Sequence, residues 1–267
     1  MVRYRSKHIA DYGILRDYCG AGLKLTTIYN YRQRGTEEDE RRITAKGEAG
    51  NTEKLTNSLS RTKNRIFELA LCNPWEWFAT LTLSPEKYDR QDLEKYRKDL
   101  SQFVRDYRKK TGHQVKYLLI PEHHQDGSWH MHGFFMGLPA EKLRAFTSNE
   151  HLPYHILKRL AEGRGVYTWE AYANKFGFAN FEAIRNQEAA SRYITKYITK
   201  EAMHTITELN AHAFFASKGL QSSVVAWKDI LVRELHSPDY ENEYLATKWF
   251  KNEDYDTALS YFEEFCI

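Results

Sequence analysis

Residues 122–135, Glu-His-His-Gln-Asp-Gly-Ser-Trp-His-Met-His-Gly-Phe-Phe, contain a carboxylate and imidazoles at a spacing that suits one divalent cation. Two apolar runs, 117–122 and 129–136, are separated by Gln-Asp-Gly-Ser, which predicts two antiparallel strands joined by a tight turn. Because side chains alternate between the faces of a strand, His130 and His132 should point the same way. The sequence therefore predicts a hairpin with two histidines on one face.

The register of this hairpin decides which side chains meet. If the turn is centred on Gly127, His130 lies opposite His124 and His132 opposite Glu122, with Cβ atoms about 5 Å apart. A shift of one residue would turn Glu122 to the other face. Two imidazoles and a carboxylate suit Mn²⁺, Mg²⁺ or Zn²⁺, with positions left open for a substrate oxygen. Glu122, His130 and His132 are the candidate ligands; His124 is the rival of Glu122, which is favoured as the harder oxygen ligand.

A second segment, residues 187–205, contains no glycine or proline and predicts a helix. On this helix Tyr193 and Tyr197 lie one turn apart on one face, and Lys196 and Lys200 form an adjacent basic stripe. Alone, this pattern is more typical of an aromatic core stripe with a solvated edge, just as a single His-x-His is more often a surface pair. A cation site together with a tyrosine pair flanked by lysines is a more specific signal than either pattern alone.

Three motifs in this order resemble those of rolling-circle replication initiators in the HUH endonuclease superfamily. Their aromatic-x-Thr-Leu-Thr strand is matched at residues 78–82, and their His-hydrophobic-His motif at residues 130–132. The nucleophilic tyrosine of the third motif is matched at Tyr193, with Lys196 following. The resemblance is in particular to filamentous-phage gene II-type and bacterial mobile-element Rep proteins, whose Ser-Lys/Arg-Gly-Leu segment is similar to residues 217–220.

The resemblance covers about residues 53–220 and implies a DNA-nicking endonuclease that uses Mn²⁺ or Mg²⁺. It implies that Tyr193 attacks the scissile phosphate with help from the field of the cation or from Lys196, giving a 5′-phosphotyrosine and a free 3′-OH, and that the nick is religated at termination. Tyr197 would allow a second cleavage, or would pack beneath the helix. The implied partner is single-stranded or hairpin origin DNA in a bacterial host cytoplasm. A host helicase and polymerase are also expected, since the sequence has no Walker A motif.

The surrounding elements predict an α+β fold. Residues 75–83 alternate as a strand, with Thr80 and Thr82 on the face toward the site. Apolar residues recur at helical spacing over residues 53–71 and 93–111. The order of strand, helix, strand, strand and helix predicts a ferredoxin-like or RRM-like antiparallel sheet with helices on one face and the other face open for ligand. This is the HUH endonuclease fold that the resemblance implies, with N-terminal and C-terminal extensions.

Residues 138–186 are too long for an ordinary connector, and they interleave aromatic residues with lysines and arginines. Such a pattern suits single-stranded DNA, where base stacking contributes about 1 to 3 kcal/mol per base. A small hydrophobic subcluster explains it equally well. The candidate DNA-binding residues of the chain are Thr80, Thr82, Trp169, Arg192 and Lys200.

Composition sets the remaining bounds. The 267 residues are 42% hydrophobic, which is ample for a packed interior, and the three cysteines show neither disulfide nor metal spacing. No run of about 18 apolar residues occurs, so no membrane segment is expected. The net charge of +3 is uneven: residues 234–267 carry nine acidic and two basic residues, −7, which leaves +10 on residues 1–233. A basic body suits a polyanion-binding domain.

These patterns predict an N-terminal extension and connector over residues 1–52, a nicking domain over 53–233 and an acidic tail over 234–267. A relaxase or transposase of the same superfamily is the main rival, because it shares the nicking chemistry. A non-catalytic DNA-binding module would need no metal-binding face. A cupin-like metalloenzyme would need a glutamate a few residues after His-x-His, and residues 133–137 contain none.

Overall fold

The computed structural model describes residues 10–31, 52–124, 126–198 and 213–262. It divides into two compact units, a terminal unit formed by Met1–Thr44 with Gln221–Ile267 and a central unit formed by Ala45–Leu220. The two ends of the chain therefore share one unit. The expected limits, at residues 52 and 233, differ from this division because strands near the two ends pair with each other.

The terminal unit is a five-stranded antiparallel sheet in the order β10-β1-β2-β12-β11. Its strands are β1 (Ala10–Asp17), β2 (Leu23–Tyr31), β10 (Val224–Ile230), β11 (Tyr240–Glu241) and β12 (Leu245–Phe250). A short 3₁₀ turn, η3 (Asn252–Asp254), leads into helix α7 (Tyr255–Leu259). Leu15 and Leu25 of the sheet pack with Tyr261 and Phe262 after this helix.

The C-terminal segment is not the acidic tail that its charge suggested. Within its described part, β12 pairs with β2, and Ala258, Tyr261 and Phe262 are buried. Apolar and aromatic residues placed between the acidic ones supply this buried side. The acidic residues in the described part of this segment therefore lie on the solvent side of a folded structure.

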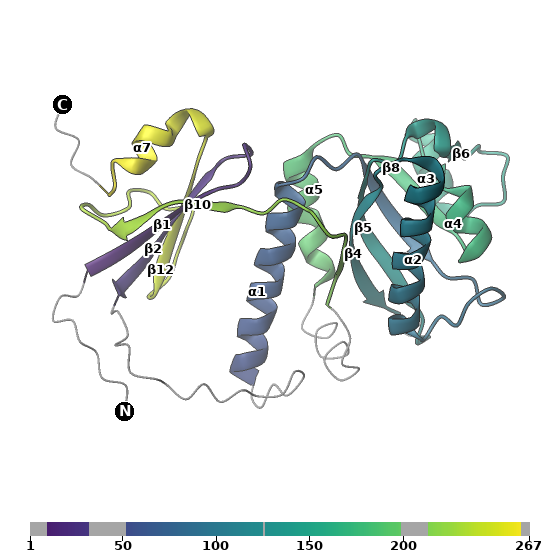
Figure 1. Ribbon diagram of the computed structural model, residues 1–267, viewed down its shortest axis with the longest axis horizontal. Helices are drawn as coiled ribbons and strands as arrows, with labels where there is room; N and C mark the ends of the chain where they lie inside the picture. Colours follow the sequence, from purple (N-terminus) through teal and green to yellow (C-terminus); the bar gives the residue numbers. More distant parts are fainter. Residues whose placement is uncertain (1–9, 32–51, 125, 199–212, 263–267) are drawn as a thin grey trace. The chain divides into compact units, whose positions relative to one another are not determined.

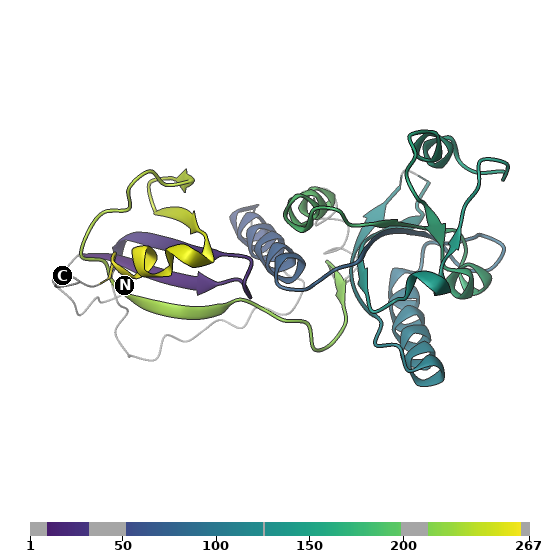
Figure 2. The ribbon, with the colours of Figure 1, turned by 90° about the horizontal axis from the view of Figure 1, so that it is seen from above.

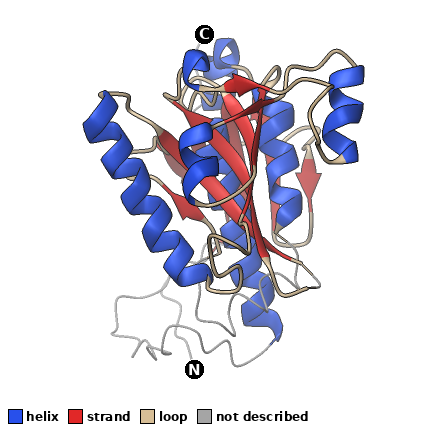
Figure 3. Ribbon diagram, turned by 90° about the vertical axis from the view of Figure 1, so that its right-hand side faces the viewer, coloured by secondary structure: helices blue, strands red, loops and turns tan. Residues whose placement is uncertain are grey.

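The central unit contains a seven-stranded sheet in the order β6-β7-β8-β3-β5-β4-β9, in which all neighbouring strands are antiparallel. Its strands are β3 (Trp77–Thr82), β4 (Lys116–His123), β5 (Trp129–Met136), β6 (Arg144–Ala145), β7 (Tyr167–Thr168), β8 (Ala179–Ala183) and β9 (Phe215–Ala216). Figure 3 shows the strands in red among the blue helices. The predicted α+β class is confirmed.

Helices cover both faces of the central sheet. The helices are α1 (Thr52–Leu71), α2 (Leu93–Thr111), α3 (Tyr154–Ala161), α4 (Glu170–Lys175) and α5 (Gln187–Ile194), with a 3₁₀ turn η1 (Ala140–Lys142) after β5. Figures 1 and 2 place α2 and α4 on one side of the sheet and α1 and α5 on the other. The second face is thus partly covered, whereas we expected it to be open.

Two cores follow from this arrangement. One contains Leu100 of α2 and Tyr172 of α4, and the other contains Ile66 of α1 and Ile194 of α5 against Phe134 of β5. The second core leaves part of its sheet face uncovered, and the candidate site lies there. In the described part of the chain, every helix is too short or too polar to span a membrane.

Candidate active site

The hairpin of β4 and β5 pairs Glu122 with His130 and Ile120 with His132. The predicted register, with His132 opposite Glu122 and His130 opposite His124, was therefore wrong by two residues. Because the displacement is even, every side chain keeps its face. Glu122, His124, His130 and His132 accordingly line one cavity, as expected.

The turn causes this displacement. The backbone N–H of His124 donates to the carbonyl of Ser128 at 2.9 Å, so the turn is centred on Asp126 rather than on Gly127. The Asp126 carboxylate accepts hydrogen bonds from the Ser128 hydroxyl at 2.6 Å and from its N–H at 3.0 Å, and these bonds lower the pKa of Asp126 to about 2. Gly127 has φ 80°, a left-handed conformation that glycine adopts easily.

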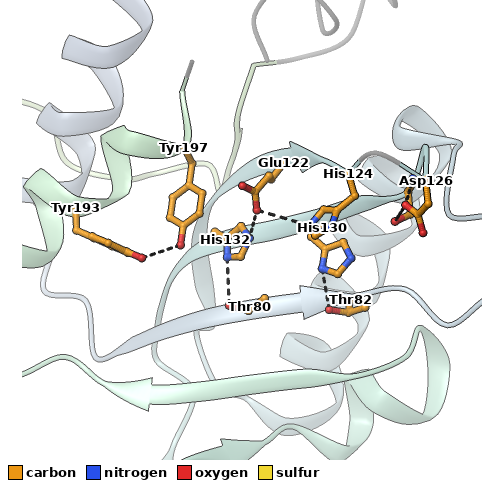
Figure 4. A network of polar contacts seen from close by, with 10 residues as sticks. Thr80, Thr82, Glu122, His124, Asp126, His130, His132, Tyr193 and Tyr197 are labelled. Atoms are coloured by element: carbon orange, nitrogen blue, oxygen red, sulfur yellow. Dashed lines mark hydrogen bonds and ion pairs between the residues drawn. The ribbon is translucent and has the colours of Figure 1, made fainter. Parts of the chain in front are cut away.

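The carboxylate of Glu122 reaches across the hairpin to the histidines (Figure 4). Its Oε2 atom lies 2.7 Å from Nε2 of His132 and 3.8 Å from Nε2 of His124. The rings of His124 and His130 stack with their centroids 3.9 Å apart. Among the residues that the structure describes, no group of three or more His, Cys, Asp or Glu side chains is arranged to hold a metal ion. Glu122 and His132 instead contact each other directly.

Strand β3 orients both histidines of β5. Thr80 Oγ1 lies 3.2 Å from Nδ1 of His132, and Thr82 Oγ1 lies 3.1 Å from Nδ1 of His130 (Figure 4). The predicted orientation of this strand, with its threonines toward the site, is confirmed. With each Nδ1 held by a hydroxyl, Nε2 is the ring atom left for a ligand, as is usual for histidines that bind metals. That these threonines contact DNA stays a prediction.

The electrostatics of the two histidines suit metal binding. Burial lowers the pKa of His130 to about 4, with the neighbouring His124 and His132 adding to the effect. Burial also lowers the pKa of His132, although Glu122 opposes this shift. Both rings are therefore neutral at pH 7, the state that offers a lone pair to a metal.

The donor types of this cluster, a carboxylate with imidazoles, are those that bind divalent cations, and in the structure they form a hydrogen-bonded pair. In the Nε2–H tautomer, neutral His132 donates to the Glu122 carboxylate and accepts at Nδ1 from the Thr80 hydroxyl, so both contacts are satisfied without a metal. A cation in place of the Nε2 proton would satisfy the carboxylate and leave the Nδ1–H to donate to Thr80. One carboxylate with imidazoles is a set that Mn²⁺ and Zn²⁺ accept readily and Mg²⁺ accepts less readily.

The tyrosine segment is less regular than predicted. Helix α5 ends at Ile194 and continues as a 3₁₀ turn, η2 (Thr195–Tyr197), so the expected helix over 187–205 is only partly present in the described residues. Residues 199–212, which include Lys200, lie outside the described part of the chain. Ile194 and Ile198 are buried in the second core and hold the segment on the sheet.

Tyr197 contacts the hairpin, and Tyr193 contacts strand β3 beside it. The ring of Tyr197 stacks on His132, with centroids 4.2 Å apart and planes 9° from parallel. The Tyr193 hydroxyl lies 3.1 Å from the Tyr197 hydroxyl, and the Tyr193 ring meets Phe78 edge to face (Figure 4). The structure thus places the Tyr197 phenol against an imidazole of the sheet and the Tyr193 phenol within hydrogen-bond distance of Tyr197.

The two phenols differ in their surroundings. Tyr193 is 45% exposed, and Lys196 Nζ lies 5.3 Å from the centroid of its ring. Tyr197 is more enclosed, and burial, the hydrogen bond to Tyr193 and the charge of Glu122 all raise its pKa above the ordinary value. Tyr193 is therefore the phenol more open to a substrate from solvent.

Trp169 is a core residue rather than a DNA-binding residue. It is 1% exposed and packs against Phe103, with ring centroids 5.1 Å apart, and against Tyr107 at 5.0 Å. Tyr172 and Phe176, which belong to the same insertion, are buried in the same core beneath α2. For these three residues, the interleaving of aromatic and basic side chains that suggested DNA stacking reflects packing of the aromatic rings in the core.

Arg192 lies on α5, one residue before Tyr193. It is exposed and pairs with Glu188, one turn earlier on the helix, at 2.9 Å. Exposed ion pairs of this kind contribute little to stability, so the guanidinium can exchange the carboxylate for a phosphate. That Arg192 contacts DNA stays a prediction.

Sequence reasoning missed the third wall of the site. The cavity has a volume of about 980 Å³, and strand β8 and helix α3 line it along with the predicted residues. Arg159 of α3 forms an ion pair with Glu182 of β8, and Asn180 lies beside Thr80. The alternation of polar and apolar residues over β8 was the signal that could have found Asn180 and Glu182.

Comparison with models of protein families gives a match over part of the chain. Residues 76–202 match the model of a family described as replication-associated protein, of the ORF2 and gene II protein type, and this segment contains β3, the histidine hairpin and both tyrosines. Neither the curated proteins nor the solved structures contain a match to the chain. The match supports a Rep-like protein whose partner is DNA. Over these residues the chain is similar to replication-associated proteins of this family.

Proposed function

We propose that this protein initiates rolling-circle replication by nicking single-stranded origin DNA with a tyrosine nucleophile. One observation carries the proposal. The Tyr197 ring lies flat on His132, and its hydroxyl bonds to that of Tyr193, so two phenols adjoin an imidazole–carboxylate cluster in one cavity. The similarity of residues 76–202 to replication-associated proteins adds independent support.

In the proposed step, the oxygen of Tyr193 attacks the scissile phosphorus. A bond forms between this oxygen and phosphorus, and the bond from phosphorus to the 3′-oxygen breaks. The phenolic proton passes to solvent, and the leaving 3′-oxygen takes up a proton to become a free 3′-OH. The ammonium of Lys196, 5.3 Å from the centroid of the Tyr193 ring, places a positive charge beside the reacting group. The 5′-phosphotyrosine preserves the energy of the broken bond for religation.

Glu122, His130 and His132 would hold a divalent cation, Mn²⁺ or Mg²⁺, with His124 as the alternative to Glu122. A bound cation polarises the phosphate and stabilises the charge that develops on its oxygens. Thr80 and Thr82 keep the two imidazoles oriented for this purpose. Tyr197 would carry out a second cleavage while the first strand remains attached to Tyr193. A host helicase and polymerase would then act on the opened origin.

The test is covalent-adduct formation with single-stranded origin-like oligonucleotides and Mn²⁺. Wild-type protein should form an adduct that resists denaturation, Tyr193→Phe should lose the first cleavage, and the double variant with Tyr197→Phe should form none. Tyr154→Phe is the matched control, since this tyrosine is 80% exposed on α3. An adduct that persists in Tyr193→Phe and disappears in Tyr197→Phe would reverse the two roles. No adduct in wild-type protein on any oligonucleotide would refute the nicking function.

A further inference from the structure

Asn180 is a buried amide that opens into the active-site cavity. It lies on β8 directly opposite Thr80, on the sheet face that carries Thr80 and His132, and its exposed fraction is 3%. Among the described residues its side chain has no hydrogen-bond partner, and its amide atoms are accessible to solvent from the cavity. A carboxamide that is held in a buried row of the sheet and bonded to no protein group leaves its donor and its acceptor available to a ligand.

Asn180 stands in line with the proposed metal ligand. His132, Thr80 and Asn180 are successive partners across β5, β3 and β8. Because neighbouring strands lie about 4.8 Å apart, Asn180 is roughly 10 Å from His132 along this row. A group bound at Asn180 would therefore lie within a nucleotide or two of a phosphate bound at the histidines.

The walls around Asn180 suit a nucleotide. Phe78 and Phe178 line the same cavity in the neighbouring rows and offer apolar ring surfaces. Arg159 and Arg164 both pair with Glu182, and they bring positive charge to the rim. The cavity of about 980 Å³ has room for a nucleotide beside the reacting phosphate.

We propose that Asn180 selects the DNA sequence at the nick by binding the edge of one unpaired nucleobase next to the scissile phosphate. The inference rests on the proposed function and adds a specificity-determining residue to it. A carboxamide presents a donor and an acceptor side by side, and the Watson–Crick edge of a base in single-stranded DNA presents the complementary pair. A phosphate alone would use only the donor half.

The test compares Asn180→Leu and Asn180→Asp with wild-type protein on oligonucleotides that carry each base in turn at every position near the nick. Wild-type protein should show one position where the preferred base raises the rate of adduct formation by about 5- to 150-fold. Asn180→Leu should flatten the preference at that position alone. Asn180→Asp should shift it toward guanine, whose edge offers two adjacent donors to a carboxylate. Asn174→Asp, at an exposed position of α4, makes the same charge change as a control.

A second measurement uses the wild-type protein and does not depend on variants of a buried residue. A photoreactive base placed at the selected position should crosslink within β8 (Ala179–Ala183). Unchanged base preferences in a folded Asn180→Leu protein, or a crosslink confined to other elements, would overturn the inference while leaving the nicking function intact. A wild-type protein that forms no adduct would instead refute the proposed function.

Discussion

Replacing Thr80 by valine tests whether β3 orients a metal ligand. Valine keeps the shape of threonine but removes the hydroxyl that lies 3.2 Å from Nδ1 of His132. The His132 side chain is only 12% exposed, so its Nδ1 would lose a partner that water cannot easily replace. Such a loss costs about 1 to 3 kcal/mol. Because the free ring could then turn or change tautomer, we expect Mn²⁺ affinity to fall about 10- to 100-fold, as for other groups that orient ligands.

Calorimetric titration with Mn²⁺ measures this effect, and the rate of adduct formation should fall in parallel. Thr80→Ser retains the hydroxyl and should bind Mn²⁺ nearly as tightly as wild type, which separates loss of the hydrogen bond from loss of packing. Thermal unfolding of each variant shows whether the protein is folded at the assay temperature. Wild-type Mn²⁺ affinity in a folded Thr80→Val, together with a clear loss in Glu122→Gln, would contradict the role given to the threonine.

Three further predictions concern the fold that supports the site. Trp169→Ala should lower the free energy of unfolding, measured by urea denaturation, by about 3 to 5 kcal/mol. Trp169→Phe should leave DNA affinity unchanged. Weaker DNA binding by a folded Trp169→Phe protein would show that Trp169 contacts DNA after all. Gly133→Ala should prevent normal folding, as judged by circular dichroism, because a Cβ would lie 2.0 Å from the Leu118 carbonyl oxygen; a cooperative wild-type melt would contradict this. The hydroxyls of Tyr96 and Tyr172 are buried and lie 2.7 Å apart. Tyr172→Phe should therefore lower the free energy of unfolding by about 1 to 3 kcal/mol, and the double variant with Tyr96→Phe should be only slightly less stable. Fully additive losses of stability would mean that the two hydroxyls act independently.

The faces of the strands could be predicted from sequence, whereas the turn could not. The sequence placed Thr80, Thr82, His130 and His132 toward the same site, because side chains two residues apart in a strand always point to the same face. The centre of the turn depends on whether the Asp126 side chain accepts from Ser128, and a Gln-Asp-Gly-Ser sequence permits more than one turn. The error of two residues in the register left every side chain on its predicted face, whereas an error of one residue would have turned Glu122 away from the site.

Long-range pairing and packing were beyond the sequence pattern. Strand β1 pairs with β10, which follows it by more than two hundred residues. No local sequence pattern indicates this pairing, so the terminal segments were expected to be separate extensions. The misassignment of Trp169 has a related cause: aromatic residues interleaved with cations look alike on a DNA platform and on an amphipathic core layer. Only the positions of α2 and α4 over the sheet distinguish the two cases.

The rows of the central sheet explain why these residues form one site although they are distant in sequence. Glu122 is the cross-strand partner of His130, and His130 is the partner of Thr82. In the next row on the same face, His132 is the partner of Thr80, and Thr80 of Asn180. Each row therefore sets a histidine beside the hydroxyl that orients it, at a spacing fixed by backbone hydrogen bonds rather than by flexible loops. Helix α5 and the turn η2 then place one tyrosine each over this face, and the buried Ile194 and Ile198 hold that segment on the sheet.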